Sequence, residues 1–277
     1  MSEVVVERYG AVLVCRLNRP QARNGLTGAL LAEYLAALEV ARTDDTVRVV
    51  VTTGEGDAFS VGANISDLDG KTARQGLNVL MHQKLGLTDT LSTADRAFDR
   101  LGIGRETLTI KNFDKPLIAA VNGAAAGGGF ALAMLHDIRL ASERATFTSA
   151  FVRIGLVVEM GLSYTLPRAI GLEAAMDMMY TGRSVGADEA RTLGLVRRLI
   201  AHDRLMDETM AYAEQVAAQA PIAVQFAKRT LSRSLDNSFL AQLELEWPYQ
   251  VAVFDTDDAK EGIAAFRERR PPRFSGR

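Results

Sequence analysis

The sequence has few of the residues that mark a metal centre, a disulfide scaffold or a nucleic-acid surface. Cys15 is the only cysteine among 277 residues, which excludes an internal disulfide and a cysteine-based zinc site. The three histidines are far apart and lack the spacing of metal ligands, so we interpret them as surface or packing residues. The net charge is −2, which indicates neither a nucleic-acid partner nor an anionic membrane partner. We expect no bound metal.

The N-terminal residues predict no targeting segment. The first nine residues carry Glu3, Glu7 and Arg8 within a strand-like pattern, which differs from a secretory signal peptide. The length and the 48% content of hydrophobic residues allow one sizeable core. We therefore expect a soluble, cytoplasmic protein.

The longest stretch without charge runs from Pro116 to Leu135 and contains three consecutive glycines, Gly127 to Gly129. Its length is close to that of a membrane span, but its glycines make a poor continuous helix. A glycine-rich turn before a helix can also hold a phosphate, although the P-loop spacing is absent. The third interpretation is a buried strand from Leu117 to Val121, followed by a buried helix from Phe130. In that case the glycines expose peptide N–H groups to an anion or simply allow close packing.

The remaining pattern predicts an α/β core over residues 1–200 and a helical region over residues 201–277. A hairpin, a helix that begins at Thr27, and a buried strand over 47–53 open the core. Pro248 is expected to interrupt one of the C-terminal helices. Helices with little sheet to pack on often cover a partner subunit, so we expect a homo-oligomer.

Several strings, in order along nearly the whole chain, resemble the enoyl-CoA hydratase/isomerase (crotonase) superfamily. They are Arg19–Leu26, Phe59–Ile65, Lys115–Gly129, Asp137–Ser142, Leu166–Arg168 with Gly171, Ala187–Val196 and Glu261–Pro271. The resemblance implies a spiral of ββα turns and a helical trimerisation region, with trimers often paired into hexamers. It also implies an acyl-CoA thioester as substrate, so that coenzyme A enters with the substrate and no separate cofactor is needed.

The resemblance further implies an oxyanion hole formed by the N–H groups of Ala63 and Gly128, which would hold the enolate oxygen. The coenzyme A contacts that it implies come from two loops and from the C-terminal helix, the latter often of a neighbouring subunit. They are Ala22, Arg23, Gly62, Ala63, Asn64, Ile65, Phe266 and Arg269.

The sequence departs from the hydratases of this family at both of their glutamate positions, which are Ala131 and Phe151 here. Neither side chain can transfer a proton. Glu159 lies where the single-carboxylate enoyl-CoA isomerases carry their acid/base group, and apolar neighbours are expected to raise its pKa. The resemblance thus favours isomerisation of an enoyl-CoA double bond.

Alternatives remain open at this point. Glu159 could be a dipole partner in the first turn of a helix, and Asp95, Asp99 or Glu106 could enter the acyl pocket, although a solvated face suits them better. Val158 and Asn64 replace the proline and aspartate that are usual in the family. The protein could also be a non-catalytic acyl-CoA binder or a weak hydratase.

Overall fold

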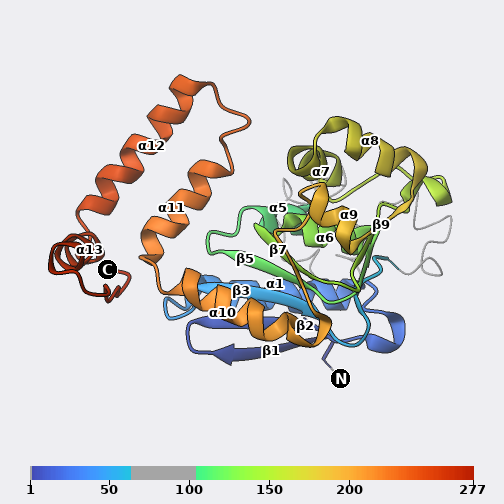
Figure 1. Ribbon diagram of the computed structural model, residues 1–277, viewed down its shortest axis with the longest axis horizontal. Coiled ribbons are helices and arrows are strands. Elements are labelled where there is room, and N and C mark those ends of the chain that lie inside the picture. The colour runs from blue at the N-terminus through green and yellow to red at the C-terminus, as the bar shows by residue number, and fades with distance from the viewer. Residues whose placement is uncertain (1, 64–103) are drawn as a thin grey trace, which may run out of the picture.

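Two β-sheets, both mostly parallel, form the body of the molecule in the computed structural model, which describes residues 2–63 and 104–277 (Figure 1). Within these residues one sheet has the strand order β1-β2-β3-β5-β7-β10 and the other the order β4-β6-β8-β9. The first contains Val4–Tyr9, Val12–Leu17, Val49–Gly54, Leu117–Val121, Ile138–Ser142 and Arg198–Ile200. The second contains Ala58–Ser60, Ala124–Ala126, Thr146–Thr148 and Ser184–Gly186.

The chain alternates between the two sheets, one turn at a time. A strand of the six-stranded sheet is followed within a few residues by a strand of the four-stranded sheet, as in β3-β4, β5-β6 and β7-β8. Helix α6 (Gly128–Leu135) completes the turn that β5 and β6 begin. This arrangement is the predicted spiral of ββα turns. The short strands β4, β6 and β9 were not anticipated, because three residues are too few to show a period.

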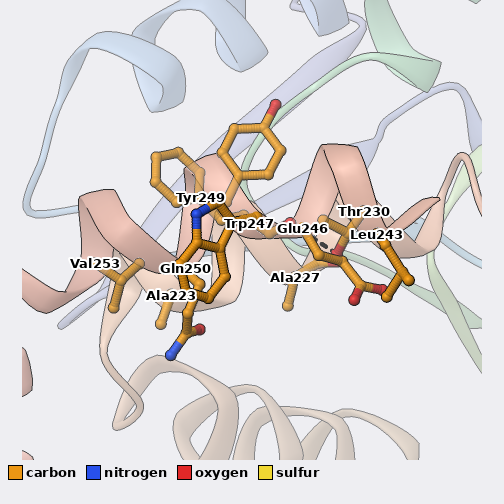
Figure 2. Close-up of a pocket in the computed structure, with 10 residues that line it drawn as sticks. Ala223, Ala227, Thr230, Leu243, Glu246, Trp247, Tyr249, Gln250 and Val253 are labelled. Atoms are coloured by element: carbon orange, nitrogen blue, oxygen red, sulfur yellow. Dashed lines mark hydrogen bonds between the residues drawn. The ribbon is translucent and has the colours of Figure 1, made fainter. Parts of the chain in front are cut away.

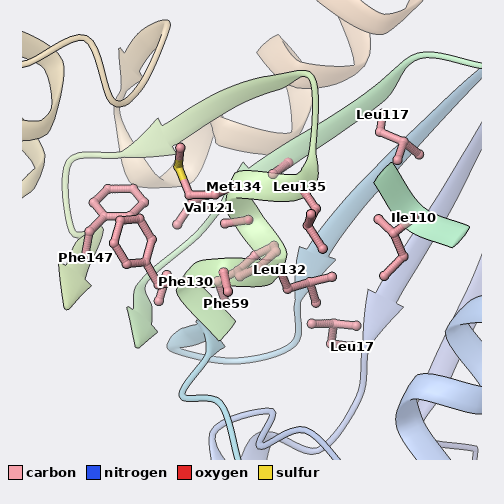
Figure 3. Close-up of a cluster of buried hydrophobic side chains, with 14 of the residues drawn as sticks. Leu17, Phe59, Ile110, Leu117, Val121, Phe130, Leu132, Met134, Leu135 and Phe147 are labelled. Atoms are coloured by element: carbon pink, nitrogen blue, oxygen red, sulfur yellow. The ribbon is translucent and has the colours of Figure 1, made fainter. Parts of the chain in front are cut away.

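The charge-free segment supplies the centre of the core. Every residue of β5 and of α6 is buried, so neither element needs a polar face. Phe130 packs on Phe147 with ring centroids 5.6 Å apart, and leucines of α6 fill the space toward β2 and α5 (Arg105–Lys111) (Figure 3). None of the described helices is both long and apolar enough to cross a bilayer.

Two helices cover the faces of the larger sheet. Helix α1 (Gly28–Thr43) begins where predicted, because the Thr27 hydroxyl accepts the N–H of Leu30 at 3.0 Å. Its other end is held by the buried ammonium of Lys115, which donates to the carbonyls of Ala41 and Asp44. Helix α10 (Leu205–Ala217) packs on β2, β3, β5 and β7.

Three further helices near the site are α7 (Leu162–Ile170), α8 (Leu172–Thr181) and α9 (Ala187–Thr192). They follow the short 3-10 helix η4 (Phe151–Ile154) and lie beside α6 in Figure 1. Shorter 3-10 turns, η1 (Pro20–Ala22) and η5 (His202–Arg204), precede α1 and α10.

The last three helices extend away from the sheets (Figure 1). They are α11 (Pro221–Leu231), α12 (Phe239–Phe254) and α13 (Asp257–Glu268). Helix α12 continues through Pro248, so the predicted interruption is wrong; the proline removes one hydrogen bond to the carbonyl of Glu244 without ending the helix. The division of the chain at residue 200 stays a prediction.

Candidate functional site

The N-terminus of α6 meets the loop that follows β4. Gly62, in this loop, has a left-handed φ of 78°. A methyl group built on it would lie 2.7 Å from the amide nitrogen of Gly128 and 2.8 Å from the carbonyl oxygen of Ala126. Only glycine fits such a contact, and it brings the segment that contains Ala63 against the first residue of α6.

The start of α6 has N–H groups without an acceptor in their own helix. Ala131 is the first residue whose N–H reaches back into the turn, to the carbonyl of Gly127 at 3.0 Å, so the N–H groups of Gly128 and Gly129 have no acceptor within the helix. The positive end of the helix dipole lies at the same place. A methyl group on Gly129 would lie 2.1 Å from the carbonyl oxygen of Ser60, so the helix and the loop touch along two residues. This backbone can hold a developing oxyanion.

The turn before α1 runs alongside the same loop. The N–H of Val61 donates to the carbonyl of Arg23 at 3.2 Å, and that of Leu26 to the carbonyl of Gly62 at 2.8 Å. Leu26 also pairs with Ala63 in a single parallel bridge. The structure therefore brings the predicted coenzyme A residues Ala22 and Arg23 next to Gly62 and Ala63. The side chain of Arg23 is exposed.

Four other predicted positions cannot be placed, and one alternative is corrected. Asn64, Ile65, Asp95 and Asp99 lie outside the described residues. Glu106 belongs to α5 and is only 7% exposed, so its interpretation as part of a solvated face is wrong.

The two C-terminal candidates lie apart from this site within one chain. Phe266 is 87% exposed on α13, and Arg269 is an exposed residue that caps the same helix. Figure 1 shows α13 at the opposite end of the molecule from α7. A single chain thus does not bring Phe266 or Arg269 to Gly128.

Glu159 lies on the loop that leads into α7. The next residue, Met160, has a left-handed φ of 52°, and Gly161 follows with 71°. This backbone turns the Met160 side chain onto the start of α6, where its sulfur is 3.5 Å from the position of a methyl group on Gly128. A carboxylate is therefore one residue away from a side chain that touches the proposed oxyanion site.

The pKa of Glu159 is raised above its ordinary value because surrounding protein displaces water from the carboxylate. The side chain still reaches solvent, which limits how far burial can raise that pKa. Val158 and Met160 pack on the core as expected, whereas Val157 is 82% exposed and contributes little. The first turn of α7 has no acidic residue, and Glu159 lies two residues before the cap, Gly161, so the helix-dipole alternative is wrong for this residue.

The two hydratase positions are apolar and buried. Ala131 lies inside α6 with no exposed surface, and Phe151 at the start of η4 is 7% exposed. Both belong to the same hydrophobic cluster as Phe130 and Phe147. Neither position offers a group that can move a proton.

A separate cleft of about 550 Å³ lies between α11 and α12 (Figure 2). Its lining combines Phe226 and Tyr249, whose rings stack at 4.5 Å, with Trp247, which is 70% exposed. None of the residues that line it belongs to the loops around Gly128.

The sequence reasoning missed the side chains that support these loops. Asn24 and Ser60 have no exposed surface and bond to backbone atoms of the turn and the loop. Asn24 also has a left-handed φ of 55°, which asparagine tolerates better than most residues. An asparagine beside a glycine was the only signal of such a turn.

The chain was compared with known proteins. Residues 7–277 match the family model described as enoyl-CoA hydratase/isomerase. A protein of Rhizobium meliloti described as a probable enoyl-CoA hydratase is 37% identical over 274 residues, 99% of this chain and 98% of that one. The 2,3-dehydroadipyl-CoA hydratase of Escherichia coli is 35% identical over 277 residues and covers 100% of both chains. The crystal structure of an enoyl-CoA hydratase from Bacillus anthracis superposes with a TM-score of 0.86 at 29% identity, covering 99% of this chain and 100% of that one.

Proposed function

Because this chain belongs to the enoyl-CoA hydratase/isomerase family, whose members act on acyl-CoA thioesters, we propose that it isomerises the double bond of an enoyl-CoA. In this proposal Glu159 is the single acid/base group. The N–H groups of Ala63 and Gly128 form the oxyanion hole.

The proposed reaction moves one proton and leaves the substrate's composition unchanged. The Glu159 carboxylate takes a proton from C2 of a 3-enoyl thioester, and the electron pair delocalises onto the thioester oxygen. The two N–H groups stabilise the resulting dienolate without having to reorient. Glu159 then returns the proton at C4, which leaves the 2-enoyl isomer. A raised pKa suits a group that must act in both directions near neutral pH.

One observation carries this proposal. Glu159 is next to Met160, whose sulfur packs at the start of α6, while both hydratase positions, Ala131 and Phe151, are buried and apolar. One carboxylate suffices to move a proton between two carbons of the same substrate. Activating a water and protonating a carbon at the same time ordinarily needs two groups, each worth about 10²–10⁴ in rate.

Coenzyme A binding and assembly belong to the same proposal. Arg23 is an exposed cation beside Gly62 and suits a phosphate. Phe266 and Arg269 would complete the coenzyme A site from a neighbouring copy, since they lie far from it in their own chain. A homotrimer, or a dimer of trimers, would also cover the apolar side chains that α12 leaves exposed, which are Phe239, Leu240, Leu243, Trp247, Val251 and Phe254.

Hydration of a 2-enoyl-CoA is the second candidate, because the relatives are named hydratases. It would require a water held by backbone groups and by Glu159 alone. We expect such a reaction to be slow, since the second proton donor is missing.

The test is to offer the purified protein a 3-enoyl-CoA and crotonyl-CoA in parallel and to identify the products by chromatography. Formation of the 2-enoyl isomer, with little hydration of crotonyl-CoA, is the expected result. Rapid hydration of crotonyl-CoA without isomerisation would contradict the proposal. Binding of both thioesters without turnover would make the protein a non-catalytic acyl-CoA binder.

A further inference from the structure

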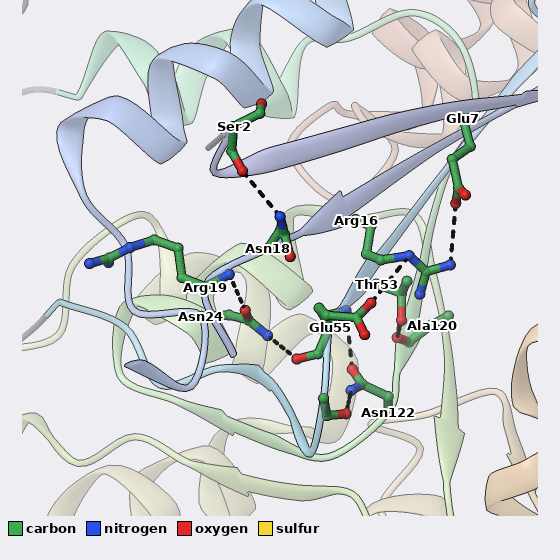
Figure 4. A network of polar contacts seen from close by, with 12 residues as sticks. Ser2, Glu7, Arg16, Asn18, Arg19, Asn24, Thr53, Glu55, Ala120 and Asn122 are labelled. Atoms are coloured by element: carbon green, nitrogen blue, oxygen red, sulfur yellow. Dashed lines mark hydrogen bonds and ion pairs between the residues drawn. The ribbon is translucent and has the colours of Figure 1, made fainter. Parts of the chain in front are cut away.

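The turn before α1 and the loop after β4 are joined by a buried asparagine. The Asn24 side-chain oxygen accepts the N–H of Arg19 at 2.8 Å, and its amide nitrogen donates to the carbonyls of Glu55 at 2.9 Å and Ala58 at 2.7 Å (Figure 4). Asn24 has no exposed surface, and the three hydrogen bonds all go to backbone atoms. It fixes the turn to both ends of the β3–β4 connection.

A buried serine continues the link toward the site. The Ser60 hydroxyl donates to the carbonyl of Asn24 at 2.7 Å and accepts the N–H of Gly62 at 3.3 Å. It has no exposed surface either. One side chain therefore fixes the distance between the turn and the residue that precedes Ala63.

The loop has no room to move without these bonds being broken. Gly62 lies against the amide nitrogen of Gly128, and the carbonyl of Ser60 lies against Gly129. These contacts limit a movement of the loop toward α6, and a movement away from α6 would separate Ala63 from Gly128. The hydrogen bonds of Asn24 and Ser60 oppose the second movement.

We propose that Asn24 and Ser60 are positioning residues that hold the N–H of Ala63 in register with that of Gly128. This inference rests on the proposed function, because it assumes that these two groups receive the thioester oxygen. The oxyanion forms in the transition state, so an error in position should reduce kcat more than it changes KM. A displacement near 1 Å costs about 10²-fold in rate.

The chain supplies a matched control. Ser149 is 1% exposed, and its hydroxyl also donates to one carbonyl, that of Met178, at 3.0 Å. It touches neither the turn nor the loop. Ser60→Ala and Ser149→Ala therefore delete the same group from equally buried positions.

The experiment measures three quantities for both variants and the wild type. They are the free energy of unfolding, kcat and KM for a 3-enoyl-CoA, and the pH at which bound acetoacetyl-CoA converts to its enolate, read from its absorbance. Both variants should lose similar stability. Only Ser60→Ala should lower kcat, by about 10- to 100-fold with KM within about threefold, and raise the enolisation pKa of the bound ligand by about one unit or more.

Equal kcat values and equal enolisation pKa values for the two variants would overturn the inference. If the wild type turns over no 3-enoyl-CoA, the isomerase proposal fails. The acetoacetyl-CoA titration still tests the positioning roles of Asn24 and Ser60, because enolisation of the bound ligand needs no Glu159. If Ser60→Ala does not fold, Asn24→Gly replaces it, since glycine accepts the left-handed backbone while the side chain and its amide are removed. It should show the same rise in the enolisation pKa, and no rise would contradict the inference.

Discussion

The two halves of the candidate site are built in opposite ways. The oxyanion half consists of backbone from Gly62 and Gly128, packed against each other and supported by side chains without exposed surface. The acid/base half is one side chain, Glu159, on a solvent-exposed loop that leads into α7. The first half depends on glycines and buried hydrogen bonds, whereas the second depends on one carboxylate.

This difference separates what the fold provides from what a single substitution can change. Charge stabilisation is part of the packing, because removing it means moving α6 or the loop before it. Proton transfer depends on single side chains, and the buried apolar residues Ala131 and Phe151 supply none. If the proposed site is correct, a chain with this fold can keep the packed backbone around Gly128 while the group that moves the proton changes.

The largest loss of activity is expected at Gly62, where the loop after β4 packs against the first residue of α6. Gly62→Ala places a methyl group 2.7 Å from the Gly128 nitrogen at a φ of 78°. We expect kcat to fall by about 10²–10³ and stability by about 2–5 kcal/mol, because the cost of overpacking adds to the strain of a left-handed φ. Gly155→Ala is the control, since Gly155 has a φ of 73° and nothing within 4 Å. Gly155→Ala should lose only about 1–2 kcal/mol of stability through backbone strain. A Gly62→Ala enzyme with normal kcat would contradict the importance of the contact between Gly62 and Gly128.

The next largest effect is on stability, at a histidine that bonds to the end of α6. His136 is buried, its Nδ1 lies 2.9 Å from the carbonyl of Leu132 in α6, and its Nε2 meets the hydroxyls of Tyr34 and Thr52. Since a carbonyl only accepts, Nδ1 carries a proton, and in the neutral ring Nε2 can accept from the two hydroxyls. Burial lowers the pKa of His136 to about 4.

The unfolded chain binds this proton at a higher pH than the folded protein does, so stability should fall as the pH drops from about 6.5 to about 4, by about 3 kcal/mol in total. Urea unfolding across this range should show the decline in the wild type and a smaller one in His136→Gln. An unchanged slope in His136→Gln would show that other groups carry the decline.

A smaller loss of kcat is expected at Met160, where the loop that carries Glu159 packs on the start of α6. Met160→Ala and Met160→Gly both remove the sulfur that packs at Gly128, and we expect each to lower kcat roughly tenfold. The glycine variant should be the more stable of the two by about 1 kcal/mol, because Met160 has a left-handed φ of 52°. Thermal unfolding and steady-state kinetics measure both quantities. An alanine variant more stable than the glycine variant would contradict the strain at this residue.

The smallest effect concerns stability at Glu159. Because its pKa is raised in the folded protein, ionised Glu159 destabilises the fold slightly above that pKa, and the penalty disappears when the pH falls below the ordinary pKa of a glutamate. Glu159→Gln should therefore have a slightly higher Tm than the wild type at pH 7 and an equal Tm at about pH 4. A lower Tm at pH 7 would contradict the sign of the pKa shift.

The sequence predicted the parts of the fold that have a long or unbroken pattern. The strand Leu117–Val121, the Thr27 cap and the buried helix after the glycines were found, because burial on all sides removes every polar residue from a segment. The helix begins at Gly128 rather than at Phe130, since glycine propensity is outweighed by packing against Ser60. Pro248 was overrated as a helix breaker, since α12 continues through it.

The candidate site could be predicted only through family resemblance. No period or spacing distinguishes Glu159 from other loop glutamates, and the contact between Gly62 and Gly128 joins residues far apart in the sequence. The supporting roles of Asn24 and Ser60 depend on hydrogen bonds between distant segments, which a single sequence does not show.

The central claim is that one carboxylate moves the proton, and kcat of Glu159→Gln on a 3-enoyl-CoA tests it most directly. The control is Glu173→Gln, which changes an exposed glutamate in the first turn of α8. We expect Glu159→Gln to lower kcat by about 10²–10⁴ with unchanged acyl-CoA affinity, while Glu173→Gln retains normal turnover. Wild-type kcat in Glu159→Gln would contradict the account.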